Sequence, residues 1–238
     1  MQLKRLLVNP VSARLLLAAC AVFFAPALAH ADTIAWASWS TDTPGNPGSA
    51  TGTVGAFTVT YSGQINQLTN VPSWTPASTF TGGVVGNAPP HTPTIQLTGG
   101  STLMESINFS STVVDPIFAI WSLGQPGVAA SFDFSSKSGQ PFNVLGGGPS
   151  AEFGGSALTA LGSVVSGHEG NGLVQFIGSF NSISFTTPQF ENYYAFTVGY
   201  DATLTPPPAV PEPATLSLFG LGLSAIPLVR RSLSRRRS

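Results

Sequence analysis

Residues 193–201, YYAFTVGYD, decide the fold class that the sequence predicts. Large side chains alternate there with smaller ones, and every second residue of a β-strand points to the same face. One face of this segment therefore carries four large side chains, Tyr194, Phe196, Val198 and Tyr200. This period of two predicts a β-strand with one face to bury.

The same alternation recurs on both sides of residues 117–123, IFAIWSL, which are apolar on both faces and predict a central strand covered on each side. The other alternating segments are GAFTVTYSG (Phe57, Val59, Tyr61), SFDFS (Phe132, Phe134) and SISF (Ile183, Phe185). Turn-rich pieces such as GNAPPHTP, GQPG and LGGGPS separate them and leave no room for a long helix. The sequence predicts an all-β fold, a single β-sandwich of roughly nine or ten strands, jelly-roll-like by preference and immunoglobulin-like as second choice.

The two ends of the chain differ from the body between them. We expect a signal peptide at 1–31, a β-sandwich body at 32–204, a proline-rich linker at 205–213, a single transmembrane helix at 214–229 and an arginine-rich cytoplasmic tail at 230–238. The start is basic, then apolar, and ends in small residues, with Ala29 and Ala31 as the positions that a signal peptidase requires. An uncleaved anchor helix and lipidation of Cys20, the sole cysteine, are the alternatives.

Charge separates the body from its ends. Between Asp32 and Pro208 the sequence has nine acidic residues and one basic residue, Lys137, which leaves a net charge of 1 − 9 = −8. Such a surface repels phosphate backbones, so nucleic-acid binding is disfavoured. Five arginines follow the C-terminal apolar run and should keep the tail cytoplasmic, namely Arg230, Arg231, Arg235, Arg236 and Arg237.

The C-terminal apolar run is short for a membrane anchor. It has 16 uncharged residues, 214–229, and as a helix it would span about 24 Å of a hydrocarbon layer of about 30 Å. A short apolar tail after a proline-rich spacer is also how removable anchors are built.

The motif Pro211-Glu212-Pro213, the apolar run and the arginine cluster together resemble the PEP-CTERM sorting signal of exported bacterial proteins. Pro227 and the segment 232–234, which splits the arginines, are mild departures. The resemblance implies recognition by an exosortase, a membrane enzyme that cleaves or transfers near the motif. It also implies a Gram-negative bacterium that makes exopolysaccharide or biofilm, with transient inner-membrane anchoring before the outer surface or the medium. IFAIWSLGQPGV and GHEGNGLVQFIGSF are similar to a recurrent PEP-CTERM cargo body without an assigned role.

The body lacks the motifs that mark common enzymes. It has no G-x-S-x-G, H-E-x-x-H, calcium-loop or P-loop pattern, so we expect no catalytic residues, no metal and no cofactor. GHEGNG, residues 167–172, places His168 beside Glu169, which suits acid–base chemistry or a metal ligand, although a tight hairpin turn explains the same residues without a function. The carboxylates that could include a glycosidase pair are Asp133, Glu152, Glu169 and Glu191.

Tryptophans offer a second candidate site. We expect Trp121 in the core strand and Trp36 packed inward with Ile34, which leaves Trp74, in the loop-like segment 71–93, as a candidate ligand-binding residue. The sequence thus predicts a non-enzymatic surface or matrix protein, delivered by its tail and linked to exopolysaccharide. The alternatives are a carbohydrate-binding module that uses Trp74, and a glycoside hydrolase that uses carboxylates such as Glu152 and Glu169.

Overall fold

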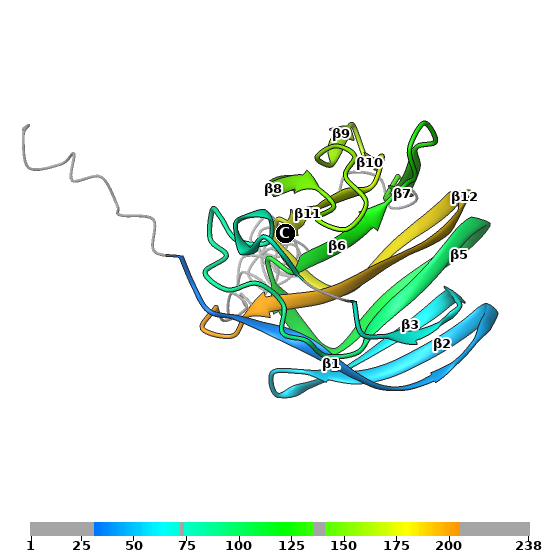
Figure 1. Cartoon of the computed structure of the whole chain (residues 1–238). Coiled ribbons are helices and arrows are strands. Elements are labelled where there is room, and N and C mark those ends of the chain that lie inside the picture. The colour runs from blue at the N-terminus through cyan, green and yellow to red at the C-terminus, as the bar shows by residue number, and fades with distance from the viewer. Residues whose placement is uncertain (1–30, 72–73, 136–140, 205–238) are drawn as a thin grey trace, which may run out of the picture.

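The computed structural model describes residues 31–71, 74–135 and 141–204 (Figure 1). These residues form twelve strands and one short 3₁₀ helix, η2 (Ala77–Thr79). The strands are β1 (Ile34–Thr43), β2 (Gly45–Val54), β3 (Phe57–Ile65), β4 (Gln67–Thr69), β5 (Thr94–Val114), β6 (Ile117–Leu123), β7 (Ala130–Asp133), β8 (Phe142–Pro149), β9 (Thr159–Leu161), β10 (Val164–Gly167), β11 (Gly170–Phe176) and β12 (Ser179–Asp201). The predicted all-β class is confirmed.

Two long strands, β5 and β12, organise the sheet. β12 has 23 residues and pairs in turn with β7, β5, β6 and β1. The pairings β12–β5–β3–β2–β1–β12 return to their starting strand, and β6, β11 and β8 extend the sheet from β12 (Figure 1). The described strands therefore form one connected sheet, not the two separate sheets that the sequence predicts, because β12 continues from one part of the fold into the other.

Irregularities in the β5–β12 ladder let these strands curve. The register shifts at four places along β12, between Phe180 and Ser182, Phe185 and Thr187, Thr187 and Phe190, and Phe190 and Tyr194. Extra residues on one strand of a pair bend it and increase its twist. The curved sheet brings distant strands to opposite sides of a shared core.

The larger core is rich in aromatic rings. Phe118 of β6 stacks on Phe196 of β12 with a centroid separation of 5.4 Å and an interplanar angle of 4°. Phe132, Phe134 and Phe185 surround this pair with edge-to-face contacts, a geometry that aromatic quadrupoles favour. The alternating residues of the predicted strands are thus buried in this core. Residues 194–201 are, however, buried on both faces.

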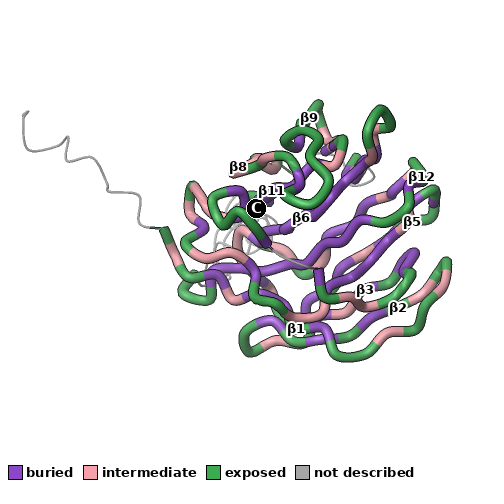
Figure 2. The backbone as a smooth tube through the Cα atoms, viewed as in Figure 1, coloured by how far each residue is buried: buried purple, intermediate pink, exposed green. Residues whose placement is uncertain are grey.

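A second, smaller core covers the other face of β6. Trp121, Ile117 and Ala119 pack there with Trp36 and Ile34 of β1, as the sequence predicts for both tryptophans. Every residue of β6 is buried, which confirms IFAIWSL as a central strand (Figure 2).

The cover of this second core is the connection between β4 and β5. Its residues Val71, Trp74, Phe80 and Val85 are each 6% exposed or less and belong to the same cluster. The prediction of a surface loop is therefore wrong for these side chains. The apolar outer face of β6 requires a cover, and this segment provides it.

The predicted signal peptide, sorting motif, transmembrane helix and arginine tail lie outside the described residues, apart from Ala31. Asp32 makes backbone hydrogen bonds with Val84 and Gly86, so the described fold includes the chain from that position. Within 31–71, 74–135 and 141–204, no helix has the length and apolar character needed to cross a membrane.

Candidate functional site

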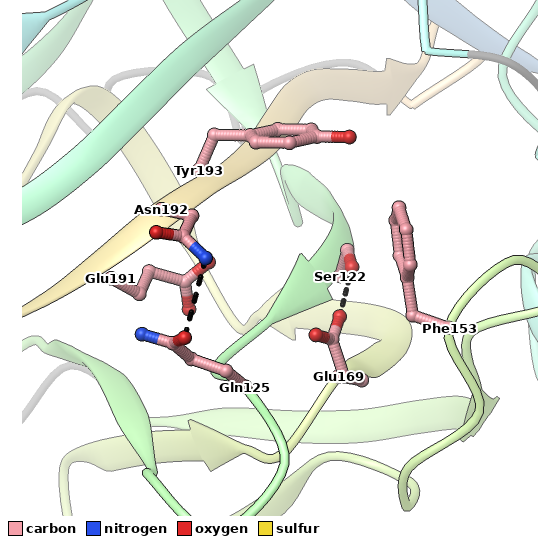
Figure 3. A pocket seen from close by; sticks show the side chains of 7 residues that line it. All are labelled: Ser122, Gln125, Phe153, Glu169, Glu191, Asn192 and Tyr193. Carbon is pink, nitrogen blue, oxygen red and sulfur yellow. Dashed lines mark hydrogen bonds between the residues drawn. The ribbon is translucent and has the colours of Figure 1, made fainter.

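A cleft of about 130 Å³ lies where β6 ends and β12 bulges (Figure 3). It is lined by Ser122, Gln125, Phe153, Glu169, Glu191, Asn192 and Tyr193. Four separate segments supply these residues: the end of β6 with its following turn, the β8–β9 connection, the β10–β11 connection and β12.

The bulge in β12 presents three of the lining residues. Phe190 pairs with Gly99 and Tyr194 with Leu97, so three residues of β12 lie opposite a single residue of β5. Such unpaired residues re-aim their side chains away from the regular alternation. This is why the consecutive residues Glu191, Asn192 and Tyr193 all reach the same cleft.

The backbone around the cleft is held in unusual conformations. Ser122 and Glu169 have positive φ angles of 54° and 57°, and non-glycine residues in this region carry a cost. Asn171 stabilises this arrangement by accepting the Ser122 N–H at 2.7 Å on Oδ1. Gly124, with φ of 83°, passes so close to the Gly167 carbonyl that a Cβ would lie 2.1 Å from its oxygen. The fold holds Ser122 and Glu169 in place by these contacts.

Two carboxylates face the cleft. The Ser122 hydroxyl donates to Oε2 of Glu169, and the Gly124 N–H donates to Oε2 of Glu191 (Figure 3 shows the first of these bonds). Glu191 is only 2% exposed. Burial raises its pKa to about 8; the Gly124 hydrogen bond opposes this shift and the negative charge of Glu169 adds to it. Glu191 is thus largely protonated at neutral pH.

Two aromatic rings line the cleft together with the acids. Tyr193 and Phe153 are 38% and 48% exposed, and their ring planes meet at 87° with centroids 6.4 Å apart (Figure 3). The buried Trp121 ring contacts both, with centroids 5.7 Å from Tyr193 and 5.9 Å from Phe153. Tyr193 and Phe153 therefore offer accessible rings that a buried indole helps to hold in place.

Neutral polar groups complete the cleft. Asn192 Nδ2 donates to Gln125 Oε1 over 3.4 Å, a long bond between two exposed side chains. Gln125 is fixed by its turn, in which its N–H and carbonyl both bond to Val128. The cleft therefore combines two acids, two aromatic faces and several neutral hydrogen-bonding groups.

The structure tests both interpretations of GHEGNG, a functional site and a hairpin turn. His168 and Glu169 do form a tight connection, from β10 to β11, but the predicted hairpin is wrong because these strands pair with others. β10 belongs with β7 and β9, and β11 with β6 and β8. Glu169 faces the cleft, whereas His168 is exposed and is not among the lining residues.

The structure brings together two of the four predicted carboxylates, Glu169 and Glu191. Asp133 lies on β7, where it caps the N–H of Ser135, and Glu152 bonds to Ser150. Neither lines the cleft, so the pair named from the sequence, Glu152 with Glu169, is not the pair that the fold assembles.

Trp74 is not the exposed platform that the sequence predicts. It is 6% exposed and packs edge-to-face on Phe80 at 4.9 Å. A sugar ring needs an open aromatic face, and Trp74 lacks one because the segment that carries it folds onto the second core. The sequence around Tyr193 and Phe153, the exposed aromatic residues of the cleft, has no pattern that marks them as binding residues. The one signal was the polar pair Glu191-Asn192, which interrupts the alternation of β12.

A second buried acid lies elsewhere, in the larger core. Glu105 is 0% exposed and its carboxyl group hydrogen-bonds with the hydroxyl groups of Tyr61 and Thr187. Desolvation raises its pKa to about 7, against the lowering effect of these hydrogen bonds. This acid is enclosed by protein. Among the described residues no group of three or more histidine, cysteine or acidic side chains could hold a metal ion.

Comparison with known proteins locates one match. The model of the PEP-CTERM protein-sorting motif matches residues 209–237, which confirms the resemblance predicted for Pro211, Glu212, Pro213 and the arginine cluster. The motif implies export and sorting by an exosortase, a membrane enzyme of Gram-negative bacteria. None of the curated proteins and none of the solved structures matches the chain.

Proposed function

Taking the PEP-CTERM sorting motif as premise, we propose that the protein is a non-enzymatic component of the cell surface or extracellular matrix, sorted by an exosortase and associated with exopolysaccharide or biofilm. The motif match is the observation that carries this proposal. The body is the working part of the mature protein, and the cleft at Glu169 and Glu191 is its binding site.

The make-up of the body supports a binding role. The cleft is small, its walls combine open aromatic faces with hydrogen-bonding groups, and several elements fix its shape. Sites for small ligands have this character, with apolar walls and a few placed polar groups. If the body binds carbohydrate, the binding site is this cleft and not the loop that carries Trp74.

Intact-mass measurement of the exported protein tests the sorting step. Cells with an active exosortase should yield a species that ends near Pro211, and cells without the enzyme should retain the full C-terminus. Replacement of Glu212 by alanine should leave the tail in place, while Glu152→Ala, which also removes one carboxylate, should be processed as usual. A mature protein that keeps all five tail arginines in enzyme-containing cells would refute exosortase processing.

Glycoside hydrolysis is the second candidate, favoured by the shared cleft of Glu169 and Glu191. A protonated acid beside a second carboxyl group is the arrangement that such enzymes use, with the two groups about 5–10 Å apart. Release of reducing ends from exopolysaccharide, lost in both Glu169→Gln and Glu191→Gln, would support it. Binding without product release supports the non-enzymatic function.

A further inference from the structure

We propose that the cleft binds a protonated amino sugar, with the ammonium group at Glu169 and Glu191 and the sugar ring against Tyr193 and Phe153. This inference rests on the proposed function and adds the ligand class. It follows from three properties of the cleft: carboxyl groups without a lysine or arginine partner among the described residues, accessible aromatic faces, and neutral polar groups spaced around them.

The carboxyl groups have no cationic partner in the described protein. Residues 31–71, 74–135 and 141–204 contain no lysine and no arginine. Glu191 is almost fully buried, yet the hydrogen bond that the structure gives it comes from one backbone N–H and engages one oxygen, Oε2. Buried charges in proteins are normally paired. An ammonium group bound here would favour release of the Glu191 proton and would pair with both carboxyl groups, a role that no lysine or arginine of the described residues fills.

The aromatic faces favour an organic cation over a metal ion. Tyr193 and Phe153 present rings at nearly a right angle, with Phe153 beside Glu169 and Tyr193 at the top of the view (Figure 3). Aromatic faces attract ammonium groups and the C–H bonds next to them. A calcium ion would instead require six or more oxygen ligands, and rings occupy part of the wall where such ligands would have to lie.

The neutral side chains favour a polyhydroxylated ligand over a plain alkylamine. Gln125 and Asn192 are joined to each other only by the 3.4 Å bond, and the remaining amide groups are free to bind hydroxyl groups. A cleft of about 130 Å³ admits one ring-sized unit. An amino sugar uses the acids, the ring faces and the amides together, whereas an alkyl diamine leaves the amides unused. Uronic acids and phosphorylated sugars are disfavoured, because their negative charge would face the negative charge of Glu169.

Titration calorimetry of the full-length protein in detergent micelles tests this assignment. The probes are a glucosamine tetramer and the N-acetylglucosamine tetramer of the same length, at pH 6, where the amine is charged. We expect the glucosamine tetramer to bind roughly tenfold or more tightly than its acetylated counterpart, because charged hydrogen bonds are lost on acetylation. Equal affinities would overturn the proposal, as would binding of neither tetramer.

Matched variants connect the binding to the cleft. Glu169→Gln and Glu191→Gln should each weaken binding of the glucosamine tetramer about tenfold, and Tyr193→Ala should weaken it by a similar factor. Glu152→Gln removes the same charge outside the cleft and should leave affinity unchanged. Near-ultraviolet circular dichroism confirms folding, and Tyr193→Phe, which keeps the ring, should restore most of the affinity. An equal loss in Glu152→Gln would mean surface charge alone, contrary to the proposal.

A diamine control tests whether the cleft recognises the sugar hydroxyl groups or only the amine. Cadaverine carries two ammonium groups and no hydroxyl groups, and we expect it to bind at least tenfold more weakly than the glucosamine tetramer. Equal binding would refute an amino-sugar site. Loss of all binding with normal exosortase-dependent processing would defeat this inference alone, whereas loss of processing would defeat the proposed function.

Discussion

Two buried glutamates, Glu105 in the larger core and Glu191 in the cleft, share a residue type and a raised pKa but not an environment. Glu105 meets the hydroxyl groups of Tyr61 and Thr187 and has no access to solvent. Glu191 meets one backbone N–H and faces a cleft with open aromatic walls. Burial raises the pKa of both, so burial does not distinguish a structural acid from a binding acid. The two kinds of acid differ instead in the hydrogen-bond partners that the protein supplies to the carboxyl group.

The hydrogen bonds of Glu105 explain why it is tolerated. The Tyr61 hydroxyl lies 2.6 Å from the Gln64 carbonyl oxygen and also meets the Glu105 carboxyl group. With one proton, the tyrosine can donate to only one of them. A protonated Glu105 resolves this by donating to the tyrosine oxygen, which agrees with its raised pKa.

The largest expected effect is a loss of stability as pH rises. The folded-state pKa values are about 7 for Glu105 and about 8 for Glu191, both above the ordinary value of 4.5. A raised folded pKa means that the folded state holds the proton more tightly, so the contribution is complete below about pH 4.5 and is lost as pH rises through 7 and 8. We expect the free energy of unfolding to fall by roughly 5 kcal/mol between pH 5 and pH 9.

Urea denaturation of the wild type and of two isosteric variants measures this fall. Glu105→Gln and Glu191→Gln should each flatten the profile, because each removes one titrating group while keeping its shape. Glu105→Gln should flatten the profile between about pH 4.5 and pH 7, and Glu191→Gln should flatten it between about pH 4.5 and pH 8. A wild-type profile that is level from pH 5 to pH 9 would show that neither acid is desolvated.

A smaller effect contrasts two aromatic residues. Trp74 is 6% exposed and packs on Phe80, whereas Tyr193 is 38% exposed at the cleft. Trp74→Ala should lower the free energy of unfolding by about 3–4 kcal/mol through the cavity that it creates. Tyr193→Ala should cost under about 1 kcal/mol and should affect ligand binding instead. Thermal denaturation of the two variants provides the comparison, and similar losses in both would contradict the assigned roles.

The smallest expected effect compares the same substitution at both acids. At pH 5, where both are largely protonated, Glu105→Ala should destabilise by about 2–3 kcal/mol, because it leaves a cavity and removes a partner from two buried hydroxyl groups. Glu191→Ala opens onto an existing cleft and should cost less than about 1 kcal/mol. If chemical denaturation shows the reverse order, Glu191 is the structural acid and the cleft is not a binding site.

Local pattern accounts for what the sequence predicted. The period of two in YYAFTVGYD and the continuous apolar run in IFAIWSL depend only on neighbouring residues, since strand geometry sets the side-chain period. The sorting motif is likewise a short linear signal, which is why residues 211–213 and the arginines could be identified without a fold. Trp121 and Trp36 were predicted to be buried for the same reason, since each shares a face with apolar neighbours.

Long-range geometry accounts for what the sequence could not predict. Trp74 lies in a proline-rich segment with weak periodicity, and its burial depends on the apolar outer face of β6, a distant part of the chain. The meeting of Glu169 with Glu191 depends on a turn and a bulge that only the assembled sheet brings together. Sequence by itself determined the strand class, the central strand and the sorting signal, because these depend on near neighbours. Only the tertiary structure decided that Glu105 is enclosed with two hydroxyl partners and that Glu191 faces a cleft with one backbone N–H, because these partners come from segments far apart in the chain.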